Sequence, residues 1–296
     1  MKLSWVFFGY CITAVTLGAI SPLSAEGQGL VTAPYPPQQA TIIIHYQGTD
    51  FAGHYDYTFL SGSLEATGIL PLNRRLFVFG GIPIGEYFAE HSNDTMSWSS
   101  SGAVIGNVSF GLGHRALTGG KTKLANSLVV MAKTMPALDD LSSESYWAMF
   151  AGWYSDPYRS ERFARRHWTI MTNSQLLFDI RPHMGICCEL RPQLYLPDGK
   201  WGHSQLWLNA GVALRYGVSR VQAIAEYVVA AWVSGDDKMS VHSRDYDAAG
   251  FGILIRFQKI IPTLYYQFAL DEFKRTRVDG MWGLRLDIPL SPGADE

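Results

Sequence analysis

The sequence predicts an all-β, transmembrane, antiparallel up-and-down barrel of about twelve strands. Apolar and polar residues alternate over long segments, and short connections between these segments alternate with longer ones. Alternation with a period of two places successive side chains on opposite faces of a sheet. Strands of soluble sandwiches usually have about five or six residues, whereas strands that cross a membrane need about nine to eleven. The long segments here therefore favour a membrane barrel with a wet interior.

The alternation is clearest between residues 168 and 290. In the segment 184–196 every even position is apolar, and charged residues such as Arg191 stand at odd positions. At the hairpins near Gly217 and Lys259 the apolar face changes from even to odd positions or back. A two-residue hairpin requires this change, because residues that pair across it share a face. The segment therefore predicts seven consecutive antiparallel strands.

The N-terminus predicts export. Lys2 is followed by an apolar run that ends in small residues, so residues 1–25 are expected to be a signal peptide cleaved after Ala25. The proline-rich segment 26–40 is expected as an extended periplasmic leader, and residues 41–296 as the barrel. The rest of the sequence has no uninterrupted apolar run of about 18 residues. These features together point to the outer membrane of a Gram-negative bacterium.

The lengths of the connections predict the topology. Outer-membrane barrels have short periplasmic turns and longer external loops. The short turns lie near Asn73, Gly119, Pro182, Gly217 and Lys259. They alternate consistently with long loops if 136–167 is one external loop, which gives twelve strands. The segment 146–154 is then a short helix, capped by Ser142 or Ser143. If that segment is a strand, the barrel has fourteen. The fourth strand is expected over 104–116, with Val104 facing lipid.

Charged residues on the strands are candidate lumen residues, because unpaired charge facing lipid is costly. They are Arg115, Asp179, Glu189, Arg191, Arg215, Glu226, Arg256, Arg285 and Asp287. Eight strands leave room only for side chains, and sixteen leave an aqueous channel, so twelve lie between these cases. The charges therefore either line a solute path or form a structural network that partly fills the lumen. The structural network is the favoured interpretation, and some of its members are still expected to set selectivity.

A second group of basic residues lies in the predicted external loop: Arg159, Arg162, Arg165 and Arg166. Guanidinium groups bind phosphate in a bidentate manner. Contact with lipopolysaccharide is therefore one hypothesis for these arginines, and a solvated loop is the favoured interpretation. The whole chain has a formal net charge of −2, which argues against a general nucleic-acid-binding protein.

The sequence indicates no catalytic, metal or cofactor site. It has no nucleotide-binding loop, no CxxC and no HExxH. His203 and Ser204 are neighbours, but adjacent strand residues face opposite ways. His114 could face lipid, yet neither histidine matches the motif of an outer-membrane phospholipase or of a lipid A deacylase. Cys187 and Cys188 are adjacent and are expected to be small packing residues. A lipid-modifying hydrolase remains an alternative function.

Two neighbouring segments carry a resemblance to a known family. The Gly-rich NVSFGLGHRAL of 107–117 is followed by KLANSLVVMAKTMP of 123–136, which ends in Lys-x-x-Pro before the long loop. Here the chain resembles the outer-membrane transporters named for a MetA pathway of phenol degradation. The final strand from Trp282 departs from this pattern, because it lacks a terminal aromatic residue. The resemblance implies passage of small apolar or aromatic compounds and supplies no catalytic residue.

The sequence thus predicts a channel or transporter for small solutes. The alternatives are a barrel with a structural or surface-interaction role and the hydrolase. The expected partners are outer-membrane lipid, lipopolysaccharide, the barrel-assembly machinery and a small solute.

Overall fold

The computed structural model describes residues 30, 35–51, 57–92, 97–136, 140–164, 167–198, 204–218, 220–234, 245–257, 259–271 and 278–290. The predicted signal peptide, 1–25, and most of the predicted leader lie outside these residues. The described residues form thirteen strands, the helix α2 (Ser143–Ser155) and the 3₁₀ helix η3 (Pro157–Phe163). The strands are β1 (Thr41–Phe51), β2 (Tyr57–Pro71), β3 (Leu76–Ser92), β4 (Ser97–Ile105), β5 (Ser109–Leu117), β6 (Thr122–Met131), β7 (His167–Arg181), β8 (Met184–Pro197), β9 (Gln205–Val218), β10 (Val221–Ser234), β11 (Asp245–Ile255), β12 (Ile261–Ala269) and β13 (Val278–Pro289).

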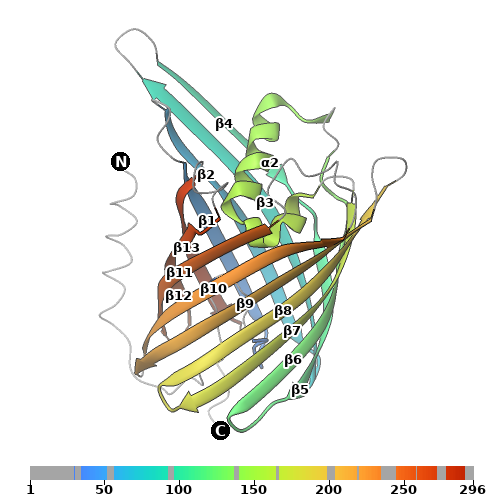
Figure 1. The fold of residues 1–296 in the computed structure, drawn as a ribbon, viewed down its shortest axis with the longest axis vertical. Helices are drawn as coiled ribbons and strands as arrows, with labels where there is room; N and C mark the ends of the chain where they lie inside the picture. Colours follow the sequence, from blue (N-terminus) through green and yellow to red (C-terminus); the bar gives the residue numbers. More distant parts are fainter. Residues whose placement is uncertain are drawn as a thin grey trace.

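The strands close into an antiparallel barrel of twelve positions (Figure 1). β1 pairs with β13 from Thr41 opposite Pro289, which closes the ring. β4 and β5 share one position, because both pair with β3, β4 along its second half and β5 along its first. The prediction of about twelve strands is confirmed, and the fourteen-strand alternative is wrong. The segment 143–155 is the helix α2, as predicted.

The fourth position differs from the prediction of one continuous strand over 104–116. The strand is interrupted at residues 106–108, and the Gly106 amide donates to the Pro83 carbonyl oxygen at 2.8 Å. Pro83, in β3, has no amide hydrogen of its own for a ladder. The interruption shifts the alternation of inward and outward residues, so Val104 is buried against α2. The prediction that Val104 faces lipid is wrong.

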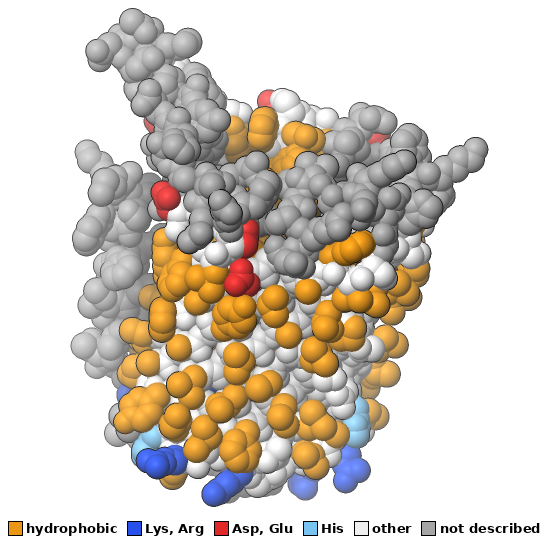
Figure 2. Space-filling view, in the orientation of Figure 1, with side chains coloured by type: hydrophobic (Ala, Val, Ile, Leu, Met, Phe, Trp, Pro, Cys, Tyr) orange, Lys and Arg blue, Asp and Glu red, His pale blue; other side chains and the backbone are white. Residues whose placement is uncertain are grey.

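The outer wall is apolar (Figure 2). In β7, for example, Ile170, Leu176 and Phe178 are exposed, whereas the residues between them are mostly buried. Phe110 and Phe251 on other strands are 64% and 61% exposed. Apolar patches of this extent are unusual on soluble monomers, and they match the lipid-facing belt of a membrane barrel. None of the described helices is long and apolar enough to cross a membrane.

Candidate functional site

The connection between β6 and β7 enters the barrel mouth. The hydroxyl oxygen of Ser142 accepts the Ser145 amide at 3.2 Å and caps α2, because the first amides of a helix have no partner within it. α2 packs against β2, β3 and β4 (Figure 1). A side chain on Gly152 would place its Cβ 2.6 Å from the Phe163 ring. The glycine therefore lets η3 fold back onto α2 and enter the lumen.

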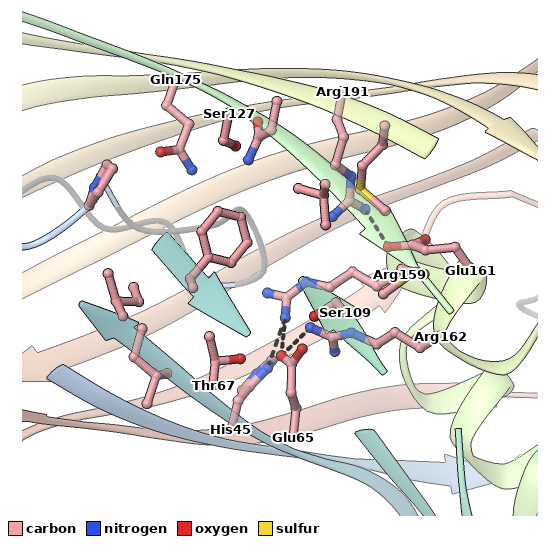
Figure 3. A pocket seen from close by; sticks show the side chains of 18 of the residues that line it. His45, Glu65, Thr67, Ser109, Ser127, Arg159, Glu161, Arg162, Gln175 and Arg191 are labelled. Atoms are coloured by element: carbon pink, nitrogen blue, oxygen red, sulfur yellow. Dashed lines mark hydrogen bonds and ion pairs between the residues drawn. The ribbon is translucent and has the colours of Figure 1, made fainter. Parts of the chain in front are cut away.

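η3 carries two arginines into the barrel, and both bind acids there (Figure 3). Arg162 binds the Glu65 carboxylate in β2 and the Asp156 carboxylate at 2.8 Å. Arg159 lies 3.4 Å from Glu65 and donates to His45 Nδ1 in β1 at 3.3 Å. All five side chains are buried. Burial lowers the pKa of the Arg162 guanidinium, and the neighbouring carboxylates oppose this effect.

A second contact joins η3 to the interruption in the fourth strand. The Asn107 amide nitrogen donates to the carbonyl oxygens of Glu161 at 3.1 Å and of Ala164 at 2.6 Å. Asn107 Oδ1 accepts a hydrogen bond from the Met135 main-chain amide at 3.2 Å. The main-chain amide of Asn107 donates to the Arg162 carbonyl oxygen at 2.6 Å. Asn107 is completely buried. It therefore fixes both ends of the inserted loop to the barrel wall.

The opposite wall holds η3 through Arg191. This side chain donates to the Tyr158 carbonyl oxygen at 2.6 Å, and its guanidinium lies 4.7 Å from the centre of the Tyr158 ring. Asn209 donates to the same carbonyl oxygen at 2.5 Å, and Glu161 lies 3.4 Å from Arg191. Burial raises the pKa of the Glu161 carboxyl, and the charge of Arg191 opposes this effect.

The N-terminal segment narrows the other end of the lumen. Arg115 donates to the carbonyl oxygens of Pro36, at 3.3 Å, and of Pro37. Tyr35 donates to the Leu117 carbonyl oxygen at 2.8 Å, and Leu30 is fully buried inside the barrel core. The described part of the predicted leader therefore lies against the inner wall.

Between these two constrictions lies a cavity of about 130 Å³. One part of its lining is apolar and comes from β1–β3, β6 and β7: Ile43, Ile69, Phe77, Phe79, Val129, Met131 and Met171. The other part is charged or polar and includes His45, Glu65, Arg159, Glu161, Arg162 and Arg191 (Figure 3), together with Asn173 and Arg285. Among the described residues, Glu161 Oε2 and Asn173 Oδ1 are buried without a hydrogen-bond partner. The cavity thus offers an apolar surface together with free acceptor atoms.

No protein-family model matches the sequence, and no curated protein matches it. Among solved structures, the COG4313 outer membrane channel from Pseudomonas putida F1 is similar, with a TM-score of 0.61 and 15% identity over 91% of this chain and 99% of that one. The NanC porin aligns with a TM-score of 0.48 and 8% identity over 84% of this chain and 99% of that one. The first likeness shows that the two chains share the barrel fold.

The structure places the predicted lumen residues on the inner wall. Arg115, Glu189, Arg191, Arg215, Glu226, Arg256, Arg285 and Asp287 are buried, and Asp179 is partly exposed. They form separate groups. Arg215 pairs with Asp179 at 2.7 Å, and Arg285 pairs with Asp287 at 2.7 Å. Arg256 donates to Gln222 at 2.8 Å. Of these nine residues, Arg191 and Arg285 line the cavity.

The predicted lipopolysaccharide contact is wrong for two of its four arginines. Arg159 and Arg162 are 7% and 4% exposed and bind acids within the lumen. Their physical partner is Glu65, which the linear sequence does not place beside them. Arg165 and Arg166 lie outside the described residues, as does His203. His114 is exposed on the outer wall, opposite Asn126 of β6.

The sequence analysis did not identify the inward-facing polar residues of β1, or Glu65 of β2, as site residues. His45 and Gln47 face inward, and His45 Nε2 lies 2.5 Å from the Tyr265 hydroxyl. Gln47 accepts a hydrogen bond from that hydroxyl at 3.0 Å. The signal was present, because these residues alternate with the outward-facing Ile42 and Ile44.

Proposed function

We propose that this barrel is an outer-membrane channel for small solutes, including apolar and aromatic compounds. The cavity with one apolar and one charged wall carries the proposal. An apolar cavity of about 150 Å³ accepts benzene, so a cavity of about 130 Å³ suits a single small ring. The apolar wall would accommodate the ring, and Glu161 Oε2 or Asn173 Oδ1 would accept a hydrogen bond from a donor on it.

The membrane assignment rests on the apolar belt, and the location rests on the N-terminal sequence. A belt of exposed Leu, Ile and Phe side chains suits a lipid environment. The signal peptide proposed over residues 1–25 would direct the chain across the inner membrane. The resemblance to the transporters of phenol degradation supports the same solute class.

The buried charges would set which ions and solutes pass. The cavity is lined by four arginines and two glutamates, and Asp156, Glu189 and Asp287 pair with these arginines from outside its lining. Positive and negative charges are therefore nearly balanced around the narrow region. A neutral solute would pass these ion pairs without competing for either partner. A permanently charged solute would compete with the existing pairs.

Single-channel recording in a planar bilayer tests the proposal. We expect discrete conductance steps that a small aromatic alcohol reduces more than a sugar of similar size. Val129→Trp would fill the cavity and abolish the difference. Leu128→Trp is the matched control, because its side chain is 52% exposed on the lipid-facing wall. A folded barrel with no conductance would overturn the channel and favour the structural alternative. Hydrolysis of added phospholipid would favour the enzyme.

A further inference from the structure

The barrel carries a ring of cations at one end. We call this the short-turn rim, made of the described residues in the turns 72–75, 118–121, 181–183, 218–220 and 257–260. Each of the five turns holds at least one cation: Arg74, Arg75, Lys121, Arg181, Arg220 and Lys259. All but Arg220 are exposed. The blue side chains along the lower edge of the barrel belong to this end (Figure 2).

No acid balances these cations on the outer side of the rim within the described part of the chain. The acids at this end are Asp179 and Asp287, and each pairs with a lumen arginine at 2.7 Å. No ion pair joins a described acid to any of the six rim cations. Exposed acids gather at the opposite end instead, among them Glu90, Asp140 and Asp279. Among the described residues, exposed cations are therefore concentrated at this end of the barrel and exposed acids at the other.

The rim cations lie where the apolar belt ends. Exposed apolar side chains precede or follow them at several of the turns: Leu72, Leu76, Leu117, Tyr216, Val221 and Ile260. In a bilayer, the headgroup phosphates lie directly beyond the apolar layer. Long Lys and Arg side chains extend from the belt edge toward that layer, and guanidinium groups bind phosphate through paired hydrogen bonds.

We propose that the short-turn rim binds the headgroups of anionic phospholipids in the leaflet that it faces. In the orientation that the connection lengths predict, with the short turns in the periplasm, this is the periplasmic leaflet. The distribution of the cations favours a lipid surface over a single anion. The turns join β2–β3, β5–β6, β7–β8, β9–β10 and β11–β12, so they recur at every second position around the ring. One small anion would meet one or two of these cations, whereas a leaflet meets all of them.

Electron spin resonance of labelled lipids measures this preference directly. The purified barrel is placed in phosphatidylcholine vesicles with a trace of spin-labelled phosphatidylglycerol or spin-labelled phosphatidylcholine. The test variant replaces Arg74, Arg75, Lys121, Arg181 and Lys259 by Gln. Lys133→Gln is the control, because it removes a cation from the opposite end. Heat-dependent migration on a gel shows whether each variant is folded.

We expect the wild-type barrel to immobilise phosphatidylglycerol about fivefold more strongly than phosphatidylcholine at sites next to one rim cation. The preference should fall to about one in the five-site variant and should persist in the control. If the variant does not fold, a salt series on the wild type replaces it. At about 1 M salt the screening length is about 3 Å, and the preference should disappear.

Three results would overturn the proposal. The first is equal immobilisation of both lipids at low salt. The second is a preference that survives in the folded five-site variant or at high salt. The third is displacement of phosphatidylglycerol by inorganic phosphate beyond the effect of chloride at equal ionic strength. That outcome would indicate isolated anion sites on the rim.

Discussion

The carboxylate of Glu65 in β2 binds the guanidinium of Arg162 in η3, which lies 97 residues further along the chain. The same carboxylate lies 3.4 Å from Arg159. Asp156, the other acid beside these two arginines, belongs to the inserted loop itself. Among the acids in this group, Glu65 therefore ties the loop to the barrel wall.

Replacing Glu65 by Gln should release η3 from the lumen. The two buried guanidiniums would then lose the carboxylate that both of them contact, and removing one partner of a buried ion pair costs about 3–5 kcal/mol. The strand ladders are unchanged, so the barrel should still assemble. We expect a larger single-channel conductance and new protease cleavage within residues 140–164.

Asp198→Asn is the control for this prediction. It removes the more exposed ion pair with Lys133, which should leave conductance unchanged because exposed pairs contribute only about 0–1 kcal/mol. Wild-type conductance and protease resistance in folded Glu65→Gln would show that the loop is held by other contacts.

Asn107→Ala should loosen the same loop from the other side. The substitution removes the two donated hydrogen bonds to Glu161 and Ala164 and the acceptor for the Met135 amide. Each buried group left without a partner costs about 1–3 kcal/mol. Hydrogen exchange should accelerate at Met135 and through η3. Asn126→Ala, on the exposed outer wall, should leave these amides protected. Unchanged exchange in both variants would contradict the anchoring role.

The sequence predicts most of the barrel wall and little of what fills its lumen. The face on which a strand residue lies depends on local alternation, so neighbouring residues alone predict the correct faces for Leu208 and Arg215. The length of the short turns then predicted the topology. The inward course of η3 depends on Glu65, which lies more than 90 residues away, so Arg159 and Arg162 resembled a solvated basic loop.

The interrupted fourth strand shows a second limit. Inward and outward residues alternate on both sides of residues 106–108. The interruption is marked only by the change of face at Val104, which lies inward although the even-numbered residues after the interruption lie outward. A sequence pattern does not show that Pro83 of the neighbouring strand meets this point. Such pairings between distant strands have to be known before the facing of Val104 can be assigned.

Arg191→Glu should make the proposed channel more selective for cations. The substitution changes the lumen charge by two units and places a third carboxylate near Glu161 and Glu189. Reversal potentials in a KCl gradient measure the effect, and Arg215→Glu should shift them in the same direction. Arg191→Lys keeps the charge and should retain most of the wild-type selectivity. If neither glutamate variant changes the reversal potential, these residues do not line the ion path.

Leu208→Arg should impair membrane assembly. Leu208 faces lipid and is 36% exposed, and an arginine on the lipid face near the middle of a bilayer costs about 2–4 kcal/mol. We expect a lower folded fraction by heat-dependent migration after refolding into vesicles. Leu208→Ala keeps the surface apolar and should fold normally. Equal folded fractions for the arginine variant and the wild type would place Leu208 outside the lipid belt.

Arg115→Met should open the end of the lumen opposite to η3. Met is apolar, so it removes the hydrogen bonds to Pro36 and Pro37 while it fills part of the space left by the guanidinium. The two constrictions lie in series along one path, and resistances in series add. Opening either one alone should therefore give an increase in conductance limited by the other. Arg115→Met combined with Glu65→Gln should exceed the sum of the two single increases. Simple addition of the increases would mean that ions pass the two constrictions along separate routes.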